Sequence, residues 1–391
     1  MKPRLLVLTP RFPYPLYGGD VLRIYRLCEA LKGSFRLTLI SMCQTQSEMD
    51  AQLPDDSPFE TVHKVYHPKW RSMANAFWAL GTGNSMQVAY YASGAFQALV
   101  TDLRDDYPYL LCHLARTAPY TAGFQGVKIL ELTDHIPLTY ARSNALDGKF
   151  LSLRRLAYTL EQGRIDAFQN DIHDGFDLIS FVSDVDRQMF LESSGASPDK
   201  VVTFGNGVDL NERPFQRDRV GKKIAFIGTL KSMPNADAVS YFLSDILPII
   251  RRSEPEAVLK VVGKVDDGFK SRFENQAVEF TGAVADLAKA VSDCVIGICP
   301  MRIGAGVQNK MLDYMAMGLP VITTQIGAEG LDPAAFVVAS TSSDFANETL
   351  SLLEDKSRRF ELADAGREIV DNGYSWDARL GNLASRIMAA S

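Results

Sequence analysis

The sequence has few cysteines, no strongly basic segment and no long apolar run. Its five cysteines, at positions 28, 43, 112, 294 and 299, form no CxxC pair and stand in apolar surroundings. This usage favours buried free thiols in a reducing cytoplasm over disulfides or a metal site. The formal net charge of −6 and the lack of a Lys/Arg run argue against a nucleic-acid partner.

No apolar run approaches the ~18 to 20 residues that a membrane-spanning helix needs. The first residues, MKPRLLVLTP, have a charged start, but their apolar run is only LLVL and passes directly into a Pro-rich loop. A signal peptide would have a longer apolar region. We therefore expect a cytoplasmic protein whose contact with a membrane is at most peripheral, at the inner face.

The chain contains two series of short strand-like segments. Its 391 residues, 46% of them hydrophobic, suffice for two domains with separate cores. The first series is RLLVLT (4–9), FRLTLISM (35–42), TVHKVYH (61–67), YPYLLCHL (107–114), KILELTD (128–134) and DLISFVS (177–183). The second is KKIAFIGT (222–229), VLKVVG, VEFTG, CVIGICP and PVITT. Helical patterns separate the segments, which predicts βαβ units and parallel sheets.

The boundary between the two series is predicted at 205–211, Gly-Asn-Gly-Val-Asp-Leu-Asn, which is rich in turn formers. The fold class is therefore α/β, with two Rossmann-like, doubly wound domains facing across a cleft. Ligands of open α/β sheets bind at the carboxyl ends of the strands. The architecture thus predicts a ligand site at those ends.

The segment 301–324, MRIGAGVQNKMLDYMAMGLPVITT, has the features of an anion site. Gly304 and Gly306 permit close approach of the backbone to a ligand. A helix that begins near Val307 presents unpaired amide groups, and Arg302 and Lys310 add positive charge. The pattern indicates a diphosphate.

Asp313, one to two turns into that helix, can accept hydrogen bonds from the vicinal hydroxyls of a ribose. Met311, Leu312, Met315 and Ala316 form the buried face. Gly318 follows as the C-cap and Pro320 stops the helix. The competing interpretation is a strand–helix junction with glycines and solvated charges, because a short glycine pattern is a weak signal by itself.

The same segment resembles the nucleotide-sugar motif of the retaining glycosyltransferases with the GT-B fold, family 4 (group 1). Asp313 matches the second acid of that family's E-x7-E pattern, whereas Ala305 stands where the first acid falls. This leaves open which group reads the hydroxyls of the donor sugar. PRFPYPLYGGDVLR, FGNGVD, FIGTLKSMPNADAV, GAEGL and YSWDARLGNLASRIM resemble further parts of the family pattern, so the resemblance spans essentially 1–391.

The resemblance implies three parts of the chain. Residues 1–208 would be an acceptor-binding Rossmann-like domain, and 209–372 a nucleotide-sugar-binding one. Residues 373–391 would be a C-terminal helix that returns to the first domain. The implied donor diphosphate site comprises Gly18, Gly19, Lys231, Arg302, Gly304, Ala305, Gly306, Val307 and Lys310. The implied nucleoside site comprises Gly228, Thr229 and Asp313. Gly18 and Gly19 are alternatively only a turn, and Lys231 a solvated loop cation.

The catalytic candidates are Asp134 and His135, just after an apolar strand whose carboxyl end is expected at the ligand site. The family often has His-Asp here, whereas this chain has Asp-His, and a structural histidine is an equal alternative. His113 is a further candidate with the same two interpretations. Asp184 and Asp186, at a helix start, are expected to cap the helix and not to bind a metal.

The implied reaction is transfer of a sugar from a nucleoside diphosphate sugar, UDP- or GDP-hexose, with retention at the anomeric carbon. The acceptor would be a hydroxyl of a glycan, a lipid-linked sugar or a small molecule, in polysaccharide or glycoconjugate biosynthesis. No cofactor or metal is expected, because cations and a helix N-terminus would neutralise the leaving diphosphate. The alternatives are a nucleotide-sugar epimerase of the same fold and a binding homologue without catalysis.

The segment KWRSMANAFWALGTG (69–83) predicts an amphipathic helix. Trp70, Met73, Phe77 and Leu80 fall at spacings of three and four, with Trp78 beside them and Lys69 and Arg71 at the start. Such a face packs against a core or, alternatively, meets a lipid-linked acceptor or an anionic membrane. Both interpretations stay open at the level of sequence.

Overall fold

The structure is a computed structural model that describes residues 2–16, 18–134, 142, 153–304 and 306–390. The chain forms two compact units. The first comprises Met1–Gly205 with Leu380–Ser391, and the second comprises Asn206–Arg379. Each unit contains one parallel sheet, so the prediction of two Rossmann-like α/β domains is confirmed.

The first unit has a seven-stranded sheet with the order β3-β2-β1-β4-β5-β6-β7. Its strands are β1 Arg4–Thr9, β2 Arg36–Cys43, β3 Phe59–Tyr66, β4 Tyr109–His113, β5 Val127–Thr133, β6 Leu178–Phe181 and β7 Val201–Thr203. Its α-helices are α1 Gly19–Leu31, α2 Gln46–Asp50, α3 Lys69–Ala79, α4 Met86–Tyr90, α5 Gly94–Leu103, α7 Leu153–Asp171, α8 Asp184–Ser194 and α17 Leu383–Ala389. Short 3-10 helices are η1 Arg104–Asp106, η2 Ala115–Thr121, η3 Ile172–Gly175 and η4 Pro198–Lys200.

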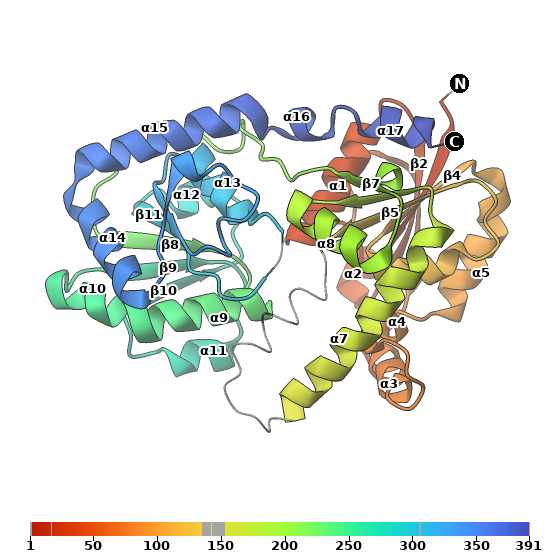
Figure 1. Ribbon diagram of the computed structural model, residues 1–391, viewed down its shortest axis with the longest axis horizontal. Helices are drawn as coiled ribbons and strands as arrows, with labels where there is room; N and C mark the ends of the chain where they lie inside the picture. The colour runs from red at the N-terminus through yellow and green to blue at the C-terminus, as the bar shows by residue number, and fades with distance from the viewer. Residues whose placement is uncertain (1, 17, 135–141, 143–152, 305, 391) are drawn as a thin grey trace. The chain divides into compact units, whose positions relative to one another are not determined.

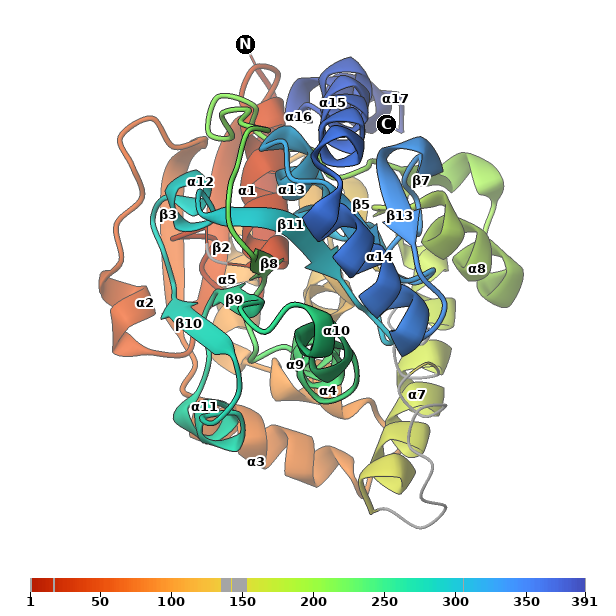
Figure 2. The same cartoon turned by 90° about the vertical axis from the view of Figure 1, so that its left-hand side faces the viewer.

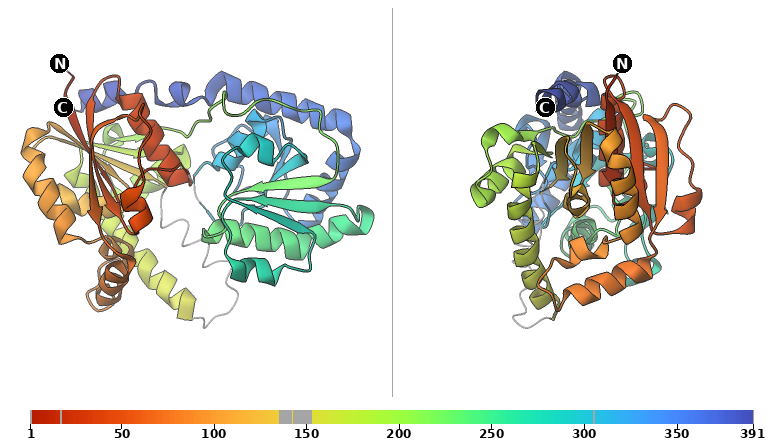
Figure 3. Two further views of the ribbon diagram at one scale, coloured as in Figure 1. Left: turned by 180° about the vertical axis from the view of Figure 1, so that it is seen from behind. Right: turned by 90° about the vertical axis from the view of Figure 1, so that its right-hand side faces the viewer.

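Both faces of this sheet are buried, which explains why its strands are continuous apolar runs. In β1, Leu6 and Leu8 belong to the same cluster as Phe96 and Val100 of α5, while Leu5 on the opposite face is equally buried. Helix α1 lies across the sheet from α5, and α17 packs beside α1 (Figures 1 and 3). The carboxyl ends of β1, β4, β5 and β6 therefore form one edge of the unit.

The second unit has a six-stranded sheet with the order β10-β9-β8-β11-β12-β13. Its strands are β8 Lys223–Ile227, β9 Val258–Val262, β10 Val278–Gly282, β11 Cys294–Cys299, β12 Val321–Thr323 and β13 Phe336–Val338. Its helices are α9 Met233–Tyr241, α10 Leu247–Ser253, α11 Asp267–Arg272, α12 Leu287–Ala290, α13 Asn309–Ala316, η6 Pro333–Ala335, α14 Ser342–Glu354 and α15 Lys356–Gly373. Helix α16, Trp376–Leu380, spans the second boundary between the units.

In this unit α9 and α10 lie on one face of the sheet and α13 on the other, where α15 packs against it (Figures 1 and 2). The order places β8 beside β11, so the loops after these two strands emerge next to each other. The segment NADAVSYFLSDILPIIRR (235–252) has a pattern typical of one continuous helix. The structure instead has a π-helical segment at Phe242–Ile246 between α9 and α10. Pro248 follows at the start of α10, and a widened turn accommodates its missing N–H.

Strands β7 and β13, three residues each, have no counterpart among the predicted segments. All five cysteines are free and buried, as predicted. Burial raises the pKa of the Cys43 thiol to about 12.

Candidate functional site

Lys310 is the central residue of the predicted donor segment in the second unit. Its side chain is buried, and its Nζ donates to Asn235 Oδ1 at 3.1 Å and to Gln308 Oε1 at 3.2 Å. Among the described residues no carboxylate lies within ion-pair distance of it. Burial lowers the pKa of Lys310. A buried ammonium with neutral partners is costly, and an anionic ligand would relieve that cost.

The loop after β8 is built around the same lysine. Gly228 has φ +156°, and a Cβ there would lie 2.8 Å from the side chain of Asn235. Asn235 donates to the Thr229 carbonyl at 3.0 Å while its oxygen accepts from Lys310. Gly228 and Thr229, predicted from sequence, are thus adjacent to Lys310 through Asn235, which the sequence analysis did not single out.

The loop after β11 supplies the predicted glycines. Gly304 has φ +139° and Gly306 has φ +71°, backbone conformations that favour glycine. Ala305 lies outside the described residues. Val307 is half-buried, and α13 begins at Asn309 with Gln308 as its N-cap, two residues later than predicted. The C-cap is Met317 rather than Gly318, which follows it with φ +74°.

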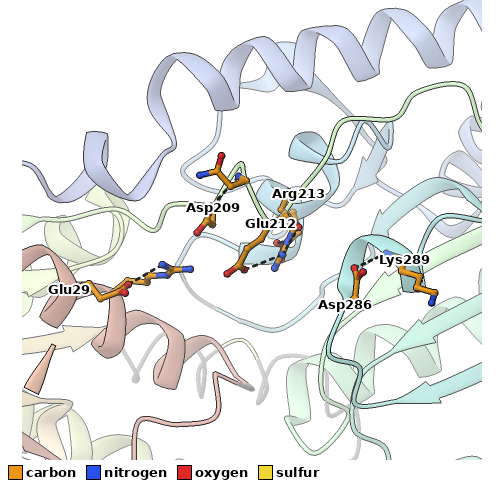
Figure 4. A network of polar contacts seen from close by, with 9 residues as sticks. Glu29, Asp209, Glu212, Arg213, Asp286 and Lys289 are labelled. Atoms are coloured by element: carbon orange, nitrogen blue, oxygen red, sulfur yellow. Dashed lines mark hydrogen bonds and ion pairs between the residues drawn. The ribbon is translucent and has the colours of Figure 1, made fainter. Parts of the chain in front are cut away.

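Arg302 and Asp313 both have protein partners. Arg302 makes a bidentate ion pair with Asp237, at 2.6 and 3.0 Å, and its guanidinium lies 4.4 Å from the Tyr241 ring centroid. Asp313 accepts from Arg213 Nε at 2.7 Å. Figure 4 shows Arg213 beside Glu212, and separately Asp286 reaching Lys289 at the start of α12.

These pairings leave the predicted roles of Arg302 and Asp313 as predictions. A carboxylate has further lone pairs for ribose hydroxyls, and Arg302 has further N–H donors. Asp237 and Arg213 were missed because neither lies near the motif in sequence. Lys231 is exposed in the loop that leads to α9.

The first unit places a buried charged cluster at the carboxyl ends of β4 and β5. Glu131, fully buried, lies 2.6 Å from Arg23 Nε and 2.6 Å from His113 Nδ1. Thr133 Oγ1 donates to the same carboxylate. Burial opposes ionisation of Glu131, but Arg23 and His113 outweigh it and lower its pKa to about 2. A carboxylate within the apolar strand KILELTD was the signal in the sequence for this cluster.

Asp134 is the next residue after Thr133, and its pKa is shifted in the opposite direction from that of Glu131. Burial, then the carboxylates of Asp186 and Glu131, raise its pKa well above the ordinary value. Thr133, just before it, has φ +66°, a strained conformation for a β-branched residue. A strained turn and a perturbed carboxyl at a strand end are marks of a functional site. His135, the other catalytic candidate, lies outside the described residues.

Other predicted residues of the first unit lie at the starts of helices. Gly18, with φ +132°, is the N-cap of α1, which begins at Gly19. Asp184 and Asp186 lie in the first turn of α8, whose N-cap is Ser183. The Ser183 hydroxyl accepts from the Asp186 amide at 3.1 Å. The expectation that Asp184 or Asp186 caps the helix is therefore wrong, because the cap is Ser183 and the two aspartates lie in the first turn.

The first unit also contains a cavity of about 670 Å³ between α4, the start of α5 and α7. Tyr91, Tyr120, Gln97, Arg116 and Arg164 are among its lining residues. Arg116 donates to the Tyr91 hydroxyl at 3.2 Å. Within the described ranges Arg116 has no ion-pair partner. The cavity thus combines aromatic walls with an available cation, and no sequence pattern indicated it.

The apolar face of α3 is exposed, so of the two interpretations left open by the sequence, packing against a core is excluded. Trp70, Met73, Phe77 and Trp78 are 66 to 76% exposed, and only Ser72 and Ala79 of this helix are buried. Spacing in a helix defines a common face but not what covers it.

Comparison with known proteins places these features in context. With its two Rossmann-like units, the chain has the fold of the GT-B structures. Anabaena Alr3699/HepE in complex with UDP and glucose has a TM-score of 0.70 at 12% identity, covering 99% of this chain and 100% of that one. A mutant of S. aureus TarM, in complex with Fondaparinux, alpha-GlcNAc-glycerol and UDP, has a TM-score of 0.67 at 11% identity, covering 99% and 100%.

Residues 221–355, which contain the candidate donor loop, match the family model for glycosyl transferases group 1. An uncharacterized 44.6 kDa protein in the cps region of Klebsiella pneumoniae is 23% identical over 56% of this chain. A GDP-mannose-dependent alpha-(1-6)-phosphatidylinositol monomannoside mannosyltransferase of Mycobacterium tuberculosis is 28% identical over 54% of it. The matches span 58% and 62% of these relatives' own lengths.

No described helix has both the length and the apolar character needed to cross a membrane. Among the described residues, no group of three or more His, Cys, Asp or Glu side chains is arranged to hold a metal ion. Independence from metal stays a prediction about the reaction.

Proposed function

We propose that this protein is a retaining glycosyltransferase of the family 4 type. It moves a hexose from UDP or GDP to a hydroxyl of a glycan, lipid-linked or small-molecule acceptor, in polysaccharide or glycoconjugate biosynthesis. The observation that carries the proposal is Lys310, a buried cation with neutral partners, in a segment similar to glycosyl transferases group 1. The UDP-bound structures and the GDP-mannose-dependent relative support a nucleotide-sugar donor.

In this proposal the leaving diphosphate sits against Gly304 and Gly306. Lys310 and the first amides of α13 stabilise the charge that develops as the anomeric bond breaks. Arg302, oriented by Asp237, adds a second cation. Asp313 reads the ribose, while Gly228 and Thr229 leave room for the base. Positioning and electrostatics then suffice for a front-face displacement with retention.

The acceptor binds the first unit, where Asp134 receives the proton of the attacking hydroxyl or passes it on. Its raised pKa suits a group that changes protonation during the reaction. The aromatic cavity with Arg116 would hold the acceptor through ring stacking and one charge-assisted contact. Peripheral contact with a membrane is part of the proposal.

A thermal-shift panel of UDP, GDP, dTDP and their sugars tests the donor assignment. A ligand at 100-fold its dissociation constant adds about 2.7 kcal/mol to the free energy of unfolding, a readily measured shift. We expect one nucleotide to stabilise the protein and its sugar conjugate to do so as well. If every nucleotide leaves the unfolding midpoint unchanged, the donor site is wrongly assigned.

Release of nucleoside diphosphate, measured with and without acceptor, separates the alternatives. A glycosyltransferase releases it in step with acceptor consumption. An epimerase acts on the donor with no acceptor present, and a binding homologue leaves the donor intact. Product analysis at the anomeric carbon then tests retention.

A further inference from the structure

Helix α3 concentrates the exposed apolar side chains of the first unit. Five large ones lie on this helix and the residue after it: Trp70 at 66%, Met73 at 67%, Phe77 at 71%, Trp78 at 76% and Leu80 at 50% exposure. The remaining exposed apolar side chains of the described chain are scattered over other elements. A contiguous apolar patch of this kind marks an interaction surface.

The helix that carries this patch is basic in an acidic protein. Helix α3 contains Lys69 and Arg71 but no Asp or Glu, a formal charge of +2 in a chain of net −6. Lys69 and Arg71 are exposed, and the Arg71 guanidinium lies 5.2 Å from the Trp70 ring centroid. The patch therefore offers apolar and positive groups together.

A second copy of the chain or a lipid surface could cover an apolar face, but only an anionic lipid surface also complements the positive charge of this one. A second copy of the chain would present the same helix, which has no acidic side chain to pair with Lys69 and Arg71. An anionic lipid surface instead accepts aromatic side chains at the boundary of head groups and acyl chains while its phosphates meet the cations.

We propose that the α3 face, defined as Lys69, Trp70, Arg71, Met73, Phe77, Trp78 and Leu80, docks on an anionic lipid bilayer. The inference stands on exposure and charge alone and does not depend on the donor chemistry. Arg164 donates to the Leu80 carbonyl at 3.1 Å and also lines the cavity of the first unit. Docking of α3 therefore holds one wall of that cavity at the lipid surface, where a membrane-anchored acceptor would reach it.

Flotation of the full chain with lipid vesicles tests the docking. We compare vesicles of phosphatidylcholine alone with vesicles that also contain phosphatidylglycerol. Two cations near the surface should raise the partition coefficient about tenfold or more on the anionic vesicles, with loss of this difference at high salt. Phe77→Gln/Trp78→Gln should lower binding to both vesicles at least tenfold, and Lys69→Gln/Arg71→Gln should remove only the anionic preference.

The matched control is Val220→Gln/Met388→Gln, which changes two exposed apolar side chains away from α3 and should bind as the parent does. Tryptophan fluorescence gives a second readout that needs no variant. Trp70 and Trp78 are exposed while Trp376 is buried, so docking should shift the emission of the parent protein to shorter wavelength.

Several results would overturn the proposal: no flotation of the parent at low salt, equal binding to both vesicles, or parent-like binding by the Phe77/Trp78 variant. A parent dimer that the same variant converts to monomer, without vesicle binding, would assign the face to a second copy. Nucleotide binding is measured on each variant, so that failure of docking is separate from failure of the donor site.

Discussion

At the scale of the residue, a substitution of Lys310 should affect ligand binding and the stability of the fold in different ways. Replacing it with methionine removes a buried charge and keeps most of the side-chain volume. We expect Lys310→Met to weaken nucleoside diphosphate binding by about 1.5 to 3 kcal/mol, while the free energy of unfolding without ligand stays equal or rises. Calorimetric titration and denaturant unfolding measure the two quantities.

The control is Lys270→Met, an exposed lysine that pairs with Asp267 in α11. It should leave nucleotide binding unchanged. A Lys310→Met variant that binds the nucleotide like the parent, or that is less stable by several kcal/mol, would show that Lys310 is structural.

Glu131 makes the pH dependence of stability predictable. Its pKa falls from an ordinary value near 4.5 to about 2 in the folded protein, so its contribution is complete above pH 4.5 and disappears as pH falls through 2. The shift corresponds to about 3 kcal/mol. We expect Glu131→Gln to destabilise by about that amount at pH 7 and by about 2 kcal/mol less at pH 3. Glu60→Gln, in an exposed pair with Arg36, should show no such dependence.

The pKa shift of Asp134 has the opposite sign from that of Glu131, so its effect on stability is also opposite. Because its pKa is raised, its ionisation costs stability as pH rises toward neutrality. Asp134→Asn should therefore unfold no more easily than the parent at pH 7, and about 1 kcal/mol of stabilisation is typical of such relief. If Asp134 transfers a proton, the same variant should lose about 10²-fold or more in transfer rate. An active Asp134→Asn enzyme would remove this residue from the mechanism.

At the scale of the element, Tyr314 fixes the helix that carries Lys310. Its hydroxyl accepts from the Ile227 amide at 2.7 Å and lies within hydrogen-bonding distance of the carbonyls of Ala225 and Ile298. Gly297 leaves room for the ring, since a Cβ there would lie 2.5 Å from it. Strands β8 and β11 are thereby joined to α13.

We expect Tyr314→Phe to lower the free energy of unfolding by about 1 to 3 kcal/mol, because the Ile227 amide loses its partner. Nucleotide affinity should fall less than in Lys310→Met, since the cation remains. Tyr66→Phe, at an exposed position, is the control and should change stability by less than about 0.5 kcal/mol. Stability equal to that of the parent would contradict the role given to the Tyr314 hydroxyl.

At the scale of the whole molecule, the chain passes between its units twice, at 205–206 and at 379–380. The Val208 amide donates to the Tyr374 carbonyl at 2.8 Å, so the two connecting segments are paired next to these crossings. A Cβ at Gly207 would lie 2.6 Å from the Trp376 amide nitrogen, which explains the glycine there.

We predict that saturating donor draws the units together by a hinge near Gly205–Asp209, with a smaller radius of gyration in small-angle scattering. The Lys310→Met variant, at a donor concentration that saturates only the parent, should scatter like the free protein. An unchanged radius for parent protein with donor bound would count against closure.

The sequence alone determined the two parallel α/β units and the glycine and lysine loop after β11. These follow from local signals: apolar runs of strand length, helical spacing between them, and residue types suited to φ > 0 and to anions. The cluster around Glu131 was only hinted at, by an acid within an apolar strand.

Only the tertiary structure decided which charges meet. Asp237 with Arg302, Arg213 with Asp313, and Arg23 with Glu131 are each separated by 65 residues or more in the chain. Their pairing depends on strand order, which no local pattern encodes. The same reason applies to α3. Spacing of three and four gathers its aromatic side chains on one face, but the rest of the fold determines that this face remains exposed.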